Sequence, residues 1–371
     1  MKATSISDVS VIGGGPAGLS AAIALSQAGC QVTVIDCAIP PIDKACGEGL
    51  MPDSLAVLDR LGIAVPFNVG YRFRGIRFAD ARSSVLATFP NGQGIGLRRT
   101  VLHDLLLQRA QDLGVTLRWG AKHVQLAGDQ VSIGGQIVKS DFVVAADGQN
   151  SPVRKHSSLQ RVTHQRRRYG FRRHYRVTPW SAYVELHWGR NCQVYITPVA
   201  QDEVCVVSMS RDSNMRLDNA LEQFPELRTR LSDAAAVSSE TGALSVSRKL
   251  RRVIESGLAL VGDSSGSVDA VTGEGLCLAF KQALSLAEAL TSGKLDAYQK
   301  EHARLSRRPR LMGSLMLTLD KHMSFQRKAL ASLGQNPEIF SSLLALHVGE
   351  GSCLNLLSWR LVPLCLTFLE V

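Results

Sequence analysis

The segment from Asp8 to Asp36, DVSVIGGGPAGLSAAIALSQAGCQVTVID, decides the fold class of this 371-residue chain. Its opening run DVSVIG predicts a buried strand, and residues 16–29 predict an Ala- and Leu-rich helix that ends at a glycine. Residues 31–36, QVTVID, predict a second buried strand. A G-x-G-x-x-G pattern lies between the first strand and the helix, at Gly13, Gly15 and Gly18. Strand, tight turn, helix and strand in this order predict a βαβ unit with two parallel strands.

Each glycine of the turn has its own steric reason. Gly13 permits the tight turn, Gly15 lets backbone N–H groups approach a pyrophosphate, and Gly18 lets the helix pack on its strand. The helix begins at Pro16–Ala17, and its N-terminus offers free donors and partial positive charge to phosphates. Asp36 ends the second strand, where a carboxylate accepts hydrogen bonds from a ribose 2′-hydroxyl. The segment therefore predicts an FAD or NAD site and disfavours NADP there.

The composition is that of an ordinary globular protein. The chain has 45% hydrophobic and 20% charged residues, and its length suggests two domains or a single large one. A formal net charge of +10 indicates an anionic partner, which can be nucleic acid, membrane lipid or a phosphate-bearing cofactor. The eight cysteines form no C-x-x-C pair, so no metal site is expected. No secretory signal and no apolar run long enough to span a membrane is found, so a cytoplasmic protein is expected.

The rest of the chain adds antiparallel strands and further helices. Alternating residues at 71–89 and 166–210 predict antiparallel strands with one wet face. Buried-type strands are predicted at 141–146 and 257–261, and helices at 51–61, 99–113 and 273–290. The predicted fold class is α/β, with a Rossmann-like, doubly wound, discontinuous dinucleotide-binding domain, an inserted antiparallel β-sheet domain for the substrate, and C-terminal helices. The domain boundaries are 1–70, 95–160 and 250–300 for the first, 71–94 and 161–249 for the second, and 301–371 for the helices.

The C-terminal segment contains three apolar stretches, at 339–349, 351–359 and 361–369. Charged residues separate the stretches, so each is too short to cross a bilayer. They predict short core or lid helices, and they leave peripheral contact with a membrane surface open.

Two more glycine turns follow buried strands, in ADGQNSPVR at residues 146–154 and in GDSSGSVDAVTGEGL at residues 262–276. Together with the first turn, this ordered set of motifs resembles the FAD-binding fold shared by group A flavin monooxygenases and geranylgeranyl reductases. The resemblance covers roughly residues 8–300. It implies that the cofactor is FAD, that the dinucleotide-binding domain is an FAD-binding domain, and that NAD(P)H is the reductant.

The resemblance also implies roles for particular residues. The Asp263 carboxylate, after Gly262, corresponds to one that holds ribityl hydroxyls of FAD. Gly273 and Gly275 lie where the family places the pyrimidine edge of the flavin, at a helix N-terminus that favours negative charge on the reduced ring. Arg99 matches an arginine that reaches the phosphates or the ribityl chain. The residues that match a motif serving both FAD and the reductant are Asp147, Gly148 and Arg154.

Candidate catalytic residues come from a loop and from the inserted sheet. The loop KACGEGL, Lys44–Leu50, resembles the reductase branch, in which a C-G-x-G stretch passes the reacting face of the flavin, and this makes Cys46 a candidate. Four residues lie on the sheet expected to floor the substrate pocket, where they can orient or deprotonate a substrate: Tyr183, Tyr195, His187 and His174. The stretch QVYITPV lacks the tryptophan pair of flavin halogenases, which ranks halogenation low.

The leading functional prediction is an FAD-dependent monooxygenase. NAD(P)H reduces FAD, oxygen gives a flavin hydroperoxide, and an apolar or aromatic small molecule is hydroxylated in a dry pocket. The alternative is saturation of a carbon–carbon double bond in an isoprenoid or lipid, as in geranylgeranyl reductases. A hypothesis of another class is an RNA-associated flavoprotein held by the arginine cluster of residues 166–176. The preferred interpretation of that cluster is a solvated sheet face or a dock for NAD(P)H phosphates, so nucleic acid is not expected as a partner.

Overall fold

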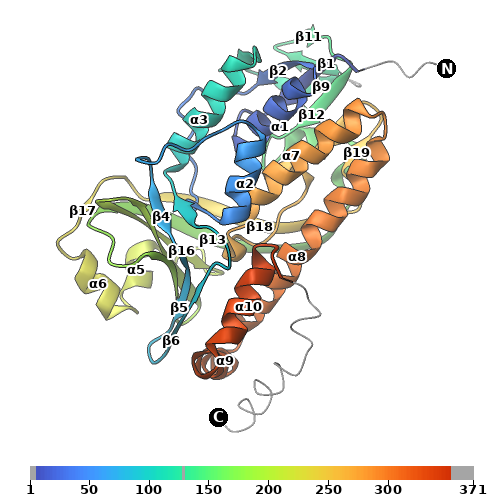
Figure 1. The fold of residues 1–371 in the computed structure, drawn as a ribbon. Coiled ribbons are helices and arrows are strands. Elements are labelled where there is room, and N and C mark those ends of the chain that lie inside the picture. Colours follow the sequence, from blue (N-terminus) through green and yellow to red (C-terminus); the bar gives the residue numbers. More distant parts are fainter. Residues whose placement is uncertain (1–5, 128–129, 352–371) are drawn as a thin grey trace.

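The computed structural model describes residues 6–127 and 130–351 (Figure 1). The predicted βαβ unit is confirmed, with β1 (Asp8–Ile12), α1 (Pro16–Gln27) and β2 (Gln31–Ile35). β1 and β2 pair in parallel, and they lie in a six-stranded sheet of order β19-β20-β12-β1-β2-β8. The other strands of that sheet are β8 (Thr116–Arg118), β12 (Phe142–Ala145), β19 (Ile254–Glu255) and β20 (Leu258–Leu260). Only β19, at one edge, is paired antiparallel among the described strands of this sheet.

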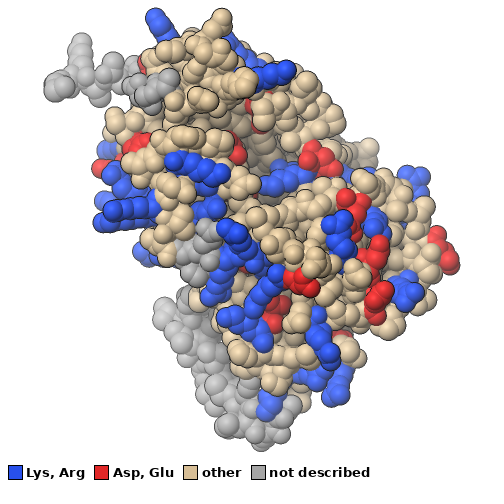
Figure 2. Space-filling model, turned by 180° about the vertical axis from the view of Figure 1, so that it is seen from behind, with Lys and Arg blue, Asp and Glu red and all other residues tan. Residues whose placement is uncertain are grey.

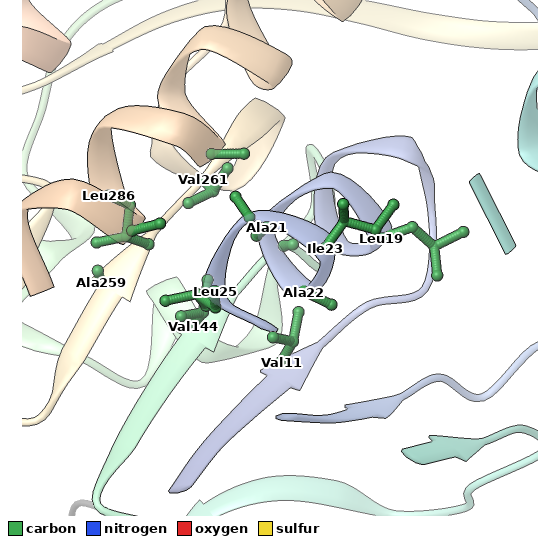
Figure 3. Packing of buried hydrophobic residues seen from close by; sticks show 14 of the residues in the cluster. Val11, Leu19, Ala21, Ala22, Ile23, Leu25, Val144, Ala259, Val261 and Leu286 are labelled. Carbon is green, nitrogen blue, oxygen red and sulfur yellow. The ribbon is translucent and has the colours of Figure 1, made fainter. Parts of the chain in front are cut away.

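One face of the parallel sheet is covered by helices. α1 contacts both α3 (Arg99–Asp112) and α7 (Gly275–Thr291), and α2 (Pro52–Arg60) lies against α7. Because α1 is enclosed by the sheet on one side and by α7 on the other, it is apolar almost all round rather than amphipathic. Figure 3 shows this core, with Ala22 near Val11 and Leu25 near Val144.

The opposite face of the sheet carries a small antiparallel sheet instead of a helix. It consists of β9 (Val124–Ala127), β10 (Gln130–Ile133) and β11 (Gln136–Val138). Val131 of β10 is fully buried in the same core as β1 and β12. The crossover from β8 to the parallel strand β12 is therefore made of strands.

The inserted segments form an eight-stranded sheet of order β17-β13-β16-β15-β14-β5-β6, with β18 also pairing to β13. Its strands are β5 (Gly75–Ala79), β6 (Ser84–Thr88), β13 (Val162–Arg176), β14 (Tyr183–Trp188), β15 (Cys192–Ala200), β16 (Glu203–Ser210), β17 (Ala235–Ala236) and β18 (Thr241–Leu250). The two pieces of chain meet where β5 pairs in parallel with β14. A three-stranded sheet joins them to the glycine-turn region and consists of β3 (Gly49–Leu50), β4 (Tyr71–Phe73) and β7 (Gly94–Gly96).

Helices cover both faces of this inserted sheet. α5 (Leu217–Leu221) and α6 (Pro225–Leu231) pack on the face that carries Phe171 and Tyr175 of β13. These two short helices lie within the stretch 217–231. The remaining helix, α4 (Pro152–Lys155), follows β12.

Three helices follow α7 in the described chain: α8 (Leu295–Lys321), α9 (Met323–Gln335) and α10 (Pro337–His347). α8 has 27 residues and runs from the parallel sheet to the inserted sheet (Figure 1). α9 and α10 pack on β6, and Phe340 of α10 stacks against Phe78 of β5 with 4.8 Å between ring centroids. The first predicted apolar stretch is thus helical as α10, whereas most of the second and all of the third lie outside the described residues. None of the helices within residues 6–127 and 130–351 combines the length and apolar character that crossing a bilayer needs.

Candidate functional site

The glycine turn after β1 is built by steric necessity. Gly13 has φ +105°, and a Cβ atom there would lie 2.4 Å from the carbonyl oxygen of Ala146. A Cβ on Gly18 would lie 1.8 Å from the carbonyl oxygen of Gly13. Gly15 differs, because its φ of −72° suits any residue and no described atom lies within 4 Å of the Cβ it would carry. The turn therefore leaves open space at the N-terminus of α1, where backbone donors collect.

Asp36 ends β2 beside this turn. Its carboxylate accepts hydrogen bonds from the N–H groups of Gly14, at 2.5 Å, and Ala38, at 2.8 Å. His103 of α3 also bonds the turn, with its Nε2 at 2.9 Å from the Gly14 carbonyl oxygen. Burial lowers the pKa of His103, so the imidazole stays neutral at physiological pH. No sequence pattern indicated His103, because it reaches the turn from a helix far along the chain.

The turns after β12 and β20 are joined by Arg154. This arginine is fully buried, and its guanidinium donates to the carbonyl oxygens of Gln149 and Ser264, each at 2.9 Å. It is therefore occupied by the backbone of both turns and is not available to a reductant, contrary to the role expected from its motif. Asp147 accepts a hydrogen bond from the Val153 N–H at 3.1 Å, and burial raises its pKa.

The three turns meet at a single cavity of about 1020 Å³. The residues predicted to bind the dinucleotide line this cavity, with two exceptions. Gly18 lies beneath the turn, as its packing role requires, and Arg154 is buried between the other two turns. Asp263 lies at the rim, with its carboxylate 3.8 Å from Lys44 Nζ. The structure thus brings together residues from three separate parts of the chain.

The residues around the cavity fit FAD. No described atom lies within 4 Å of the Cβ that Gly15, Gly148, Gly273 or Gly275 would carry, so these backbones leave an open cradle. Arg99 Nε and Asp147 Oδ1 are buried at the cavity without a hydrogen-bond partner among the described residues. Buried polar atoms are rarely left unpaired, so both are suited to bind polar atoms of a ligand. In this arrangement Asp36 would hold the ribose and the N-terminus of α1 the pyrophosphate.

The cavity continues into a part that we call the apolar chamber. On one side it is bounded by the inserted sheet, through side chains that alternate along each strand. On the other side it is roofed by α8, α9 and α10. Its lining residues from these elements are Ile76, Phe78, Val184, Leu186, Met316, Leu319, Leu333, Phe340 and Leu344.

Of the three catalytic candidates, two line the cavity. Cys46 lies in its wall and Tyr195 in the floor of the apolar chamber, where the hydroxyl points to the Val271 carbonyl oxygen at 3.5 Å. His187 does not reach the cavity. It alternates with Leu186 along β14, so its ring faces the opposite side of the sheet, where Nε2 lies 2.8 Å from Glu185 Oε2 and the ring packs on Phe224. The expectation that His187 contacts the substrate is therefore not met, because the pleat turns it away.

His174, the fourth sheet residue considered, is occupied by a buried cluster behind the loop of Cys46. Its Nε2 lies 2.6 Å from Glu48 Oε2, and Glu48 Oε1 also accepts from Arg172 at 3.3 Å and from the Arg99 N–H at 2.9 Å. Glu48, His174 and Cys205 lie close enough together to ligate a metal. Glu48 is, however, already bonded to His174, Arg172 and Arg99 N–H, and burial raises the pKa of Cys205 well above its usual value. We interpret the cluster as the anchor of residues 44–50.

The arginine cluster on β13 is arranged differently from the prediction. Arg168 and Arg172 are almost completely buried, and they pair with Asp269 at 3.2 Å and Asp43 at 2.7 Å respectively. The prediction of a solvated arginine face is wrong for these two residues, because the loops that follow β2 and β20 cover that face of the sheet. RNA cannot reach them in the folded protein. The net positive charge is instead carried by other residues, and Figure 2 shows Lys and Arg prominent across the rear face.

His302 of α8 makes the turn after β20 sensitive to acid. Its Nε2 lies 2.9 Å from Ser265 Oγ, and that hydroxyl donates to the Gly262 carbonyl oxygen at 2.7 Å. Burial lowers the pKa of His302 from 6.5 to about 4. Between these values the unfolded chain binds a proton that the folded protein does not, so stability falls as the pH falls through this window.

We expect His302 to make the free energy of unfolding roughly 2 kcal/mol lower at pH 5 than at pH 7. Each pH unit within the window contributes at most about 1.4 kcal/mol. Urea denaturation at both pH values measures this difference. In His302→Gln the amide can still bond Ser265 but cannot be protonated, so the difference should shrink by that amount. The same substitution at the exposed His156 is the control. Equal pH dependence in His302→Gln and wild type would contradict the assignment.

Comparisons with known proteins agree with this geometry. The model of the FAD binding domain family matches residues 7–308. Menaquinone reductase from Mycolicibacterium smegmatis is 29% identical over 323 residues, which cover 78% of this chain and 78% of the relative. The putative FAD-dependent monooxygenase YetM from Bacillus subtilis is 26% identical over 337 residues, which cover 79% of this chain and 88% of the relative.

A solved structure shows the same fold. The flavin-dependent brominase Bmp2 superposes with a TM-score of 0.78 over 99% of this chain and 98% of its own, at 17% identity. At that identity the likeness concerns the fold alone. Since the family model covers most of the chain and its cofactor turns converge on one cavity, the chain belongs to the FAD binding domain family and is an FAD-dependent oxidoreductase.

Proposed function

We propose that the chain uses NAD(P)H to reduce a carbon–carbon double bond in an elongated apolar substrate, such as an isoprenoid or lipid chain. The observation that carries this proposal is the apolar chamber, which opens directly from the flavin turns and has the Tyr195 hydroxyl, a proton donor, at its floor. FAD, when bound, supplies the chemistry by taking a hydride from NAD(P)H and passing it to the substrate.

The side chains at the chamber favour reduction over hydroxylation of a phenol. Reducing a double bond adds a hydride to one carbon and a proton to the other, so a protonated side chain is required nearby. Burial raises the pKa of Tyr195 far above its usual value, so its hydroxyl remains protonated. Cys46 lies in the cavity wall and is the second candidate. A phenol needs a base instead. His174 and His187, the expected bases, are both held away from the chamber. His347 lines the cavity, but its Nε2 is bonded to the Thr272 carbonyl oxygen.

The size and character of the chamber support an apolar chain as substrate. Sheet side chains and three helices enclose it with aliphatic and aromatic groups, which bind hydrocarbon by excluding water. The relative named menaquinone reductase, which aligns over 78% of this chain, is consistent with a reductase acting on such a molecule. The ranking derived from the sequence, with hydroxylation first, is thus reversed in this proposal.

Hydroxylation remains the second candidate, and the same chamber favours it. A dry, apolar environment protects reactive oxygen chemistry from water, and the relative YetM is named as a putative monooxygenase. The two reactions differ in their need for oxygen and in what they add to the substrate.

The decisive experiment follows the product of the FAD-loaded protein. We expect NADPH or NADH, without oxygen, to convert menaquinone or a geranylgeranyl lipid into a product whose hydrocarbon chain has gained two hydrogen atoms by mass spectrometry. For menaquinone this gain must persist after the ring is re-oxidised in air, because reduction of the quinone ring alone also adds two hydrogen atoms. A product that has gained one oxygen atom, formed only in air, would overturn the reductase proposal and support hydroxylation.

Substitutions at the chamber test the proton donor. We expect Tyr195→Phe to lower kcat by about 100-fold if the hydroxyl donates the proton, since general acids typically contribute this much or more. Tyr183→Phe is the matched control, because Tyr183 lies on the same sheet but bonds toward Thr88, at 3.4 Å, outside the cavity. Cys46→Ser is measured in parallel. Wild-type rates in both Tyr195→Phe and Cys46→Ser would contradict both assignments.

A further inference from the structure

Glu274 lies between the two glycines of the flavin loop, residues 272–275, yet its side chain points away from the cavity. It is 2% exposed and is not among the lining residues. Its Oε1 accepts a hydrogen bond from Arg308 of α8 at 3.2 Å. Its Oε2 lies 3.4 Å from Nδ1 of His347, the last residue of α10. The carboxylate thus connects the flavin loop to two helices that roof the apolar chamber.

His347 contacts the same loop a second time. Its Nε2 lies 3.0 Å from the Thr272 carbonyl oxygen, which can only accept, so Nε2 must carry a proton. A neutral ring would then present the lone pair of Nδ1 to a carboxylate oxygen of Glu274, which is repulsive. Neither Nδ1 nor Oε2 has a hydrogen-bond partner among the described residues, and a proton on either atom would let the two bond. With Nε2 bonded to the loop and Nδ1 facing Glu274, His347 is suited to hold the loop.

The surroundings of the pair are charged but balanced. Arg308 also approaches Asp53 of α2, at 3.5 Å, and Lys281 of α7 bonds the same Asp53 carboxylate at 2.6 Å. Cys277 of α7 lies 3.2 Å from it as well. Burial raises the pKa of Glu274, which favours its protonated form, and that form can donate its proton to His347 Nδ1. Once that proton is lost, the contact between the loop and α10 changes from attractive to repulsive.

We propose that Glu274 and His347 are positioning residues that couple the flavin loop to α10, so that FAD binding and the seating of the chamber roof stabilise each other. α10 contributes Phe340 and Leu344 to the chamber and His347 to its junction with the loop. A ligand that fixes the loop must therefore also stabilise the seated position of α10. Because coupling is reciprocal, loosening α10 must weaken binding of the ligand by the same factor. This inference rests on FAD binding and does not depend on which reaction the chamber supports.

The first test is amide hydrogen exchange of residues 337–347 with and without FAD. We expect bound FAD to slow exchange in α10 of the wild-type protein, although α10 belongs to the roof of the apolar chamber. In His347→Phe we expect FAD to bind about tenfold more weakly, a typical coupling, and to leave α10 exchange unchanged. FAD affinity is read from flavin fluorescence, so the test needs no substrate and is separate from the reaction proposed above.

A pH series tests whether a proton between Glu274 and His347, rather than packing alone, carries the coupling. Glu274→Gln replaces the proton with an amide N–H that cannot be lost and keeps an oxygen for Arg308. We expect FAD affinity of the wild type to fall from neutral to alkaline pH, whereas Glu274→Gln keeps the neutral-pH affinity throughout. Glu338→Gln, on the exposed side of α10, is the matched control and should follow the wild type.

Two results would overturn the coupling. One is unchanged α10 exchange in wild-type protein that has demonstrably bound FAD. The other is the same pH dependence of FAD affinity in Glu274→Gln and the wild type. If His347→Phe does not fold, this comparison of wild type with Glu274→Gln still decides the question.

Discussion

Replacing Gly15 by valine should abolish FAD binding while leaving the fold intact. Gly15 has φ −72°, an ordinary value for valine, and no described atom lies within 4 Å of the Cβ position. The new Cβ is therefore not crowded, but the valine side chain fills the space at the N-terminus of α1 that is suited to the pyrophosphate. We expect at least a 100-fold loss of FAD affinity, or about 2.7 kcal/mol, with an unchanged melting temperature of the apoprotein.

The comparison variants for Gly15→Val separate binding from folding. Gly334→Val, at an exposed site in α9 that is also free of described neighbours, should bind FAD as the wild type does. Gly18→Ala should instead destabilise the apoprotein, since its Cβ would lie 1.8 Å from a carbonyl oxygen. Flavin absorbance after gel filtration and calorimetry measure the two effects. A yellow, FAD-loaded Gly15→Val protein would refute the placement of the pyrophosphate.

The second large effect is expected at Glu48. In Glu48→Ala the buried His174 and Arg172 lose a carboxylate at 2.6 Å and 3.3 Å, and the first turn of α3 loses the acceptor of the Arg99 N–H. Removing one partner of a buried ionic cluster leaves the others uncompensated, which costs about 3–5 kcal/mol. Because Glu48 anchors the loop of Cys46, we also expect weaker FAD binding.

Glu48→Gln is the matched variant, since it keeps the same positive backbone φ of 58° and an oxygen acceptor but loses the charge. It should lose less stability than Glu48→Ala. Urea denaturation gives both free energies of unfolding, and FAD titration reports the loop. A loss in Glu48→Ala of less than about 1 kcal/mol, the value of one ordinary hydrogen bond, would show that the cluster does not anchor the loop.

The site could be predicted from the sequence where local sterics dictate the residue. Gly13 and Gly18 are required by a backbone turn that is complete within a few residues, so their spacing alone reveals the turn. Asp36 could also be predicted, because it ends the next strand about 20 residues after the glycines, where a ribose-binding carboxylate is expected. The long strand β18 was missed, because glycine and basic residues weaken its alternation and its stability comes from pairing along β13.

Alternation along a strand predicts which residues share a face, but it does not say what covers that face. Arg168 and Arg172 share a face of β13, as the period of two requires, and that face is buried under loops from elsewhere in the chain. His187 was assigned to the pocket from its place on a strand of the sheet alone, and its face of the sheet points away from the pocket. Whether a face meets solvent, helices or a cofactor depends on contacts that no local pattern encodes.

The sequence by itself determined the cofactor class, because the glycine turns and Asp36 obey short-range steric rules. Only the tertiary structure decided which titratable residues meet around them. His347 contacts Thr272 from 75 residues further along the chain, and His174 contacts Glu48 across 126 residues. Such pairs have no spacing signal, because their distance in space is set by how helices and sheets pack rather than by the geometry of one segment.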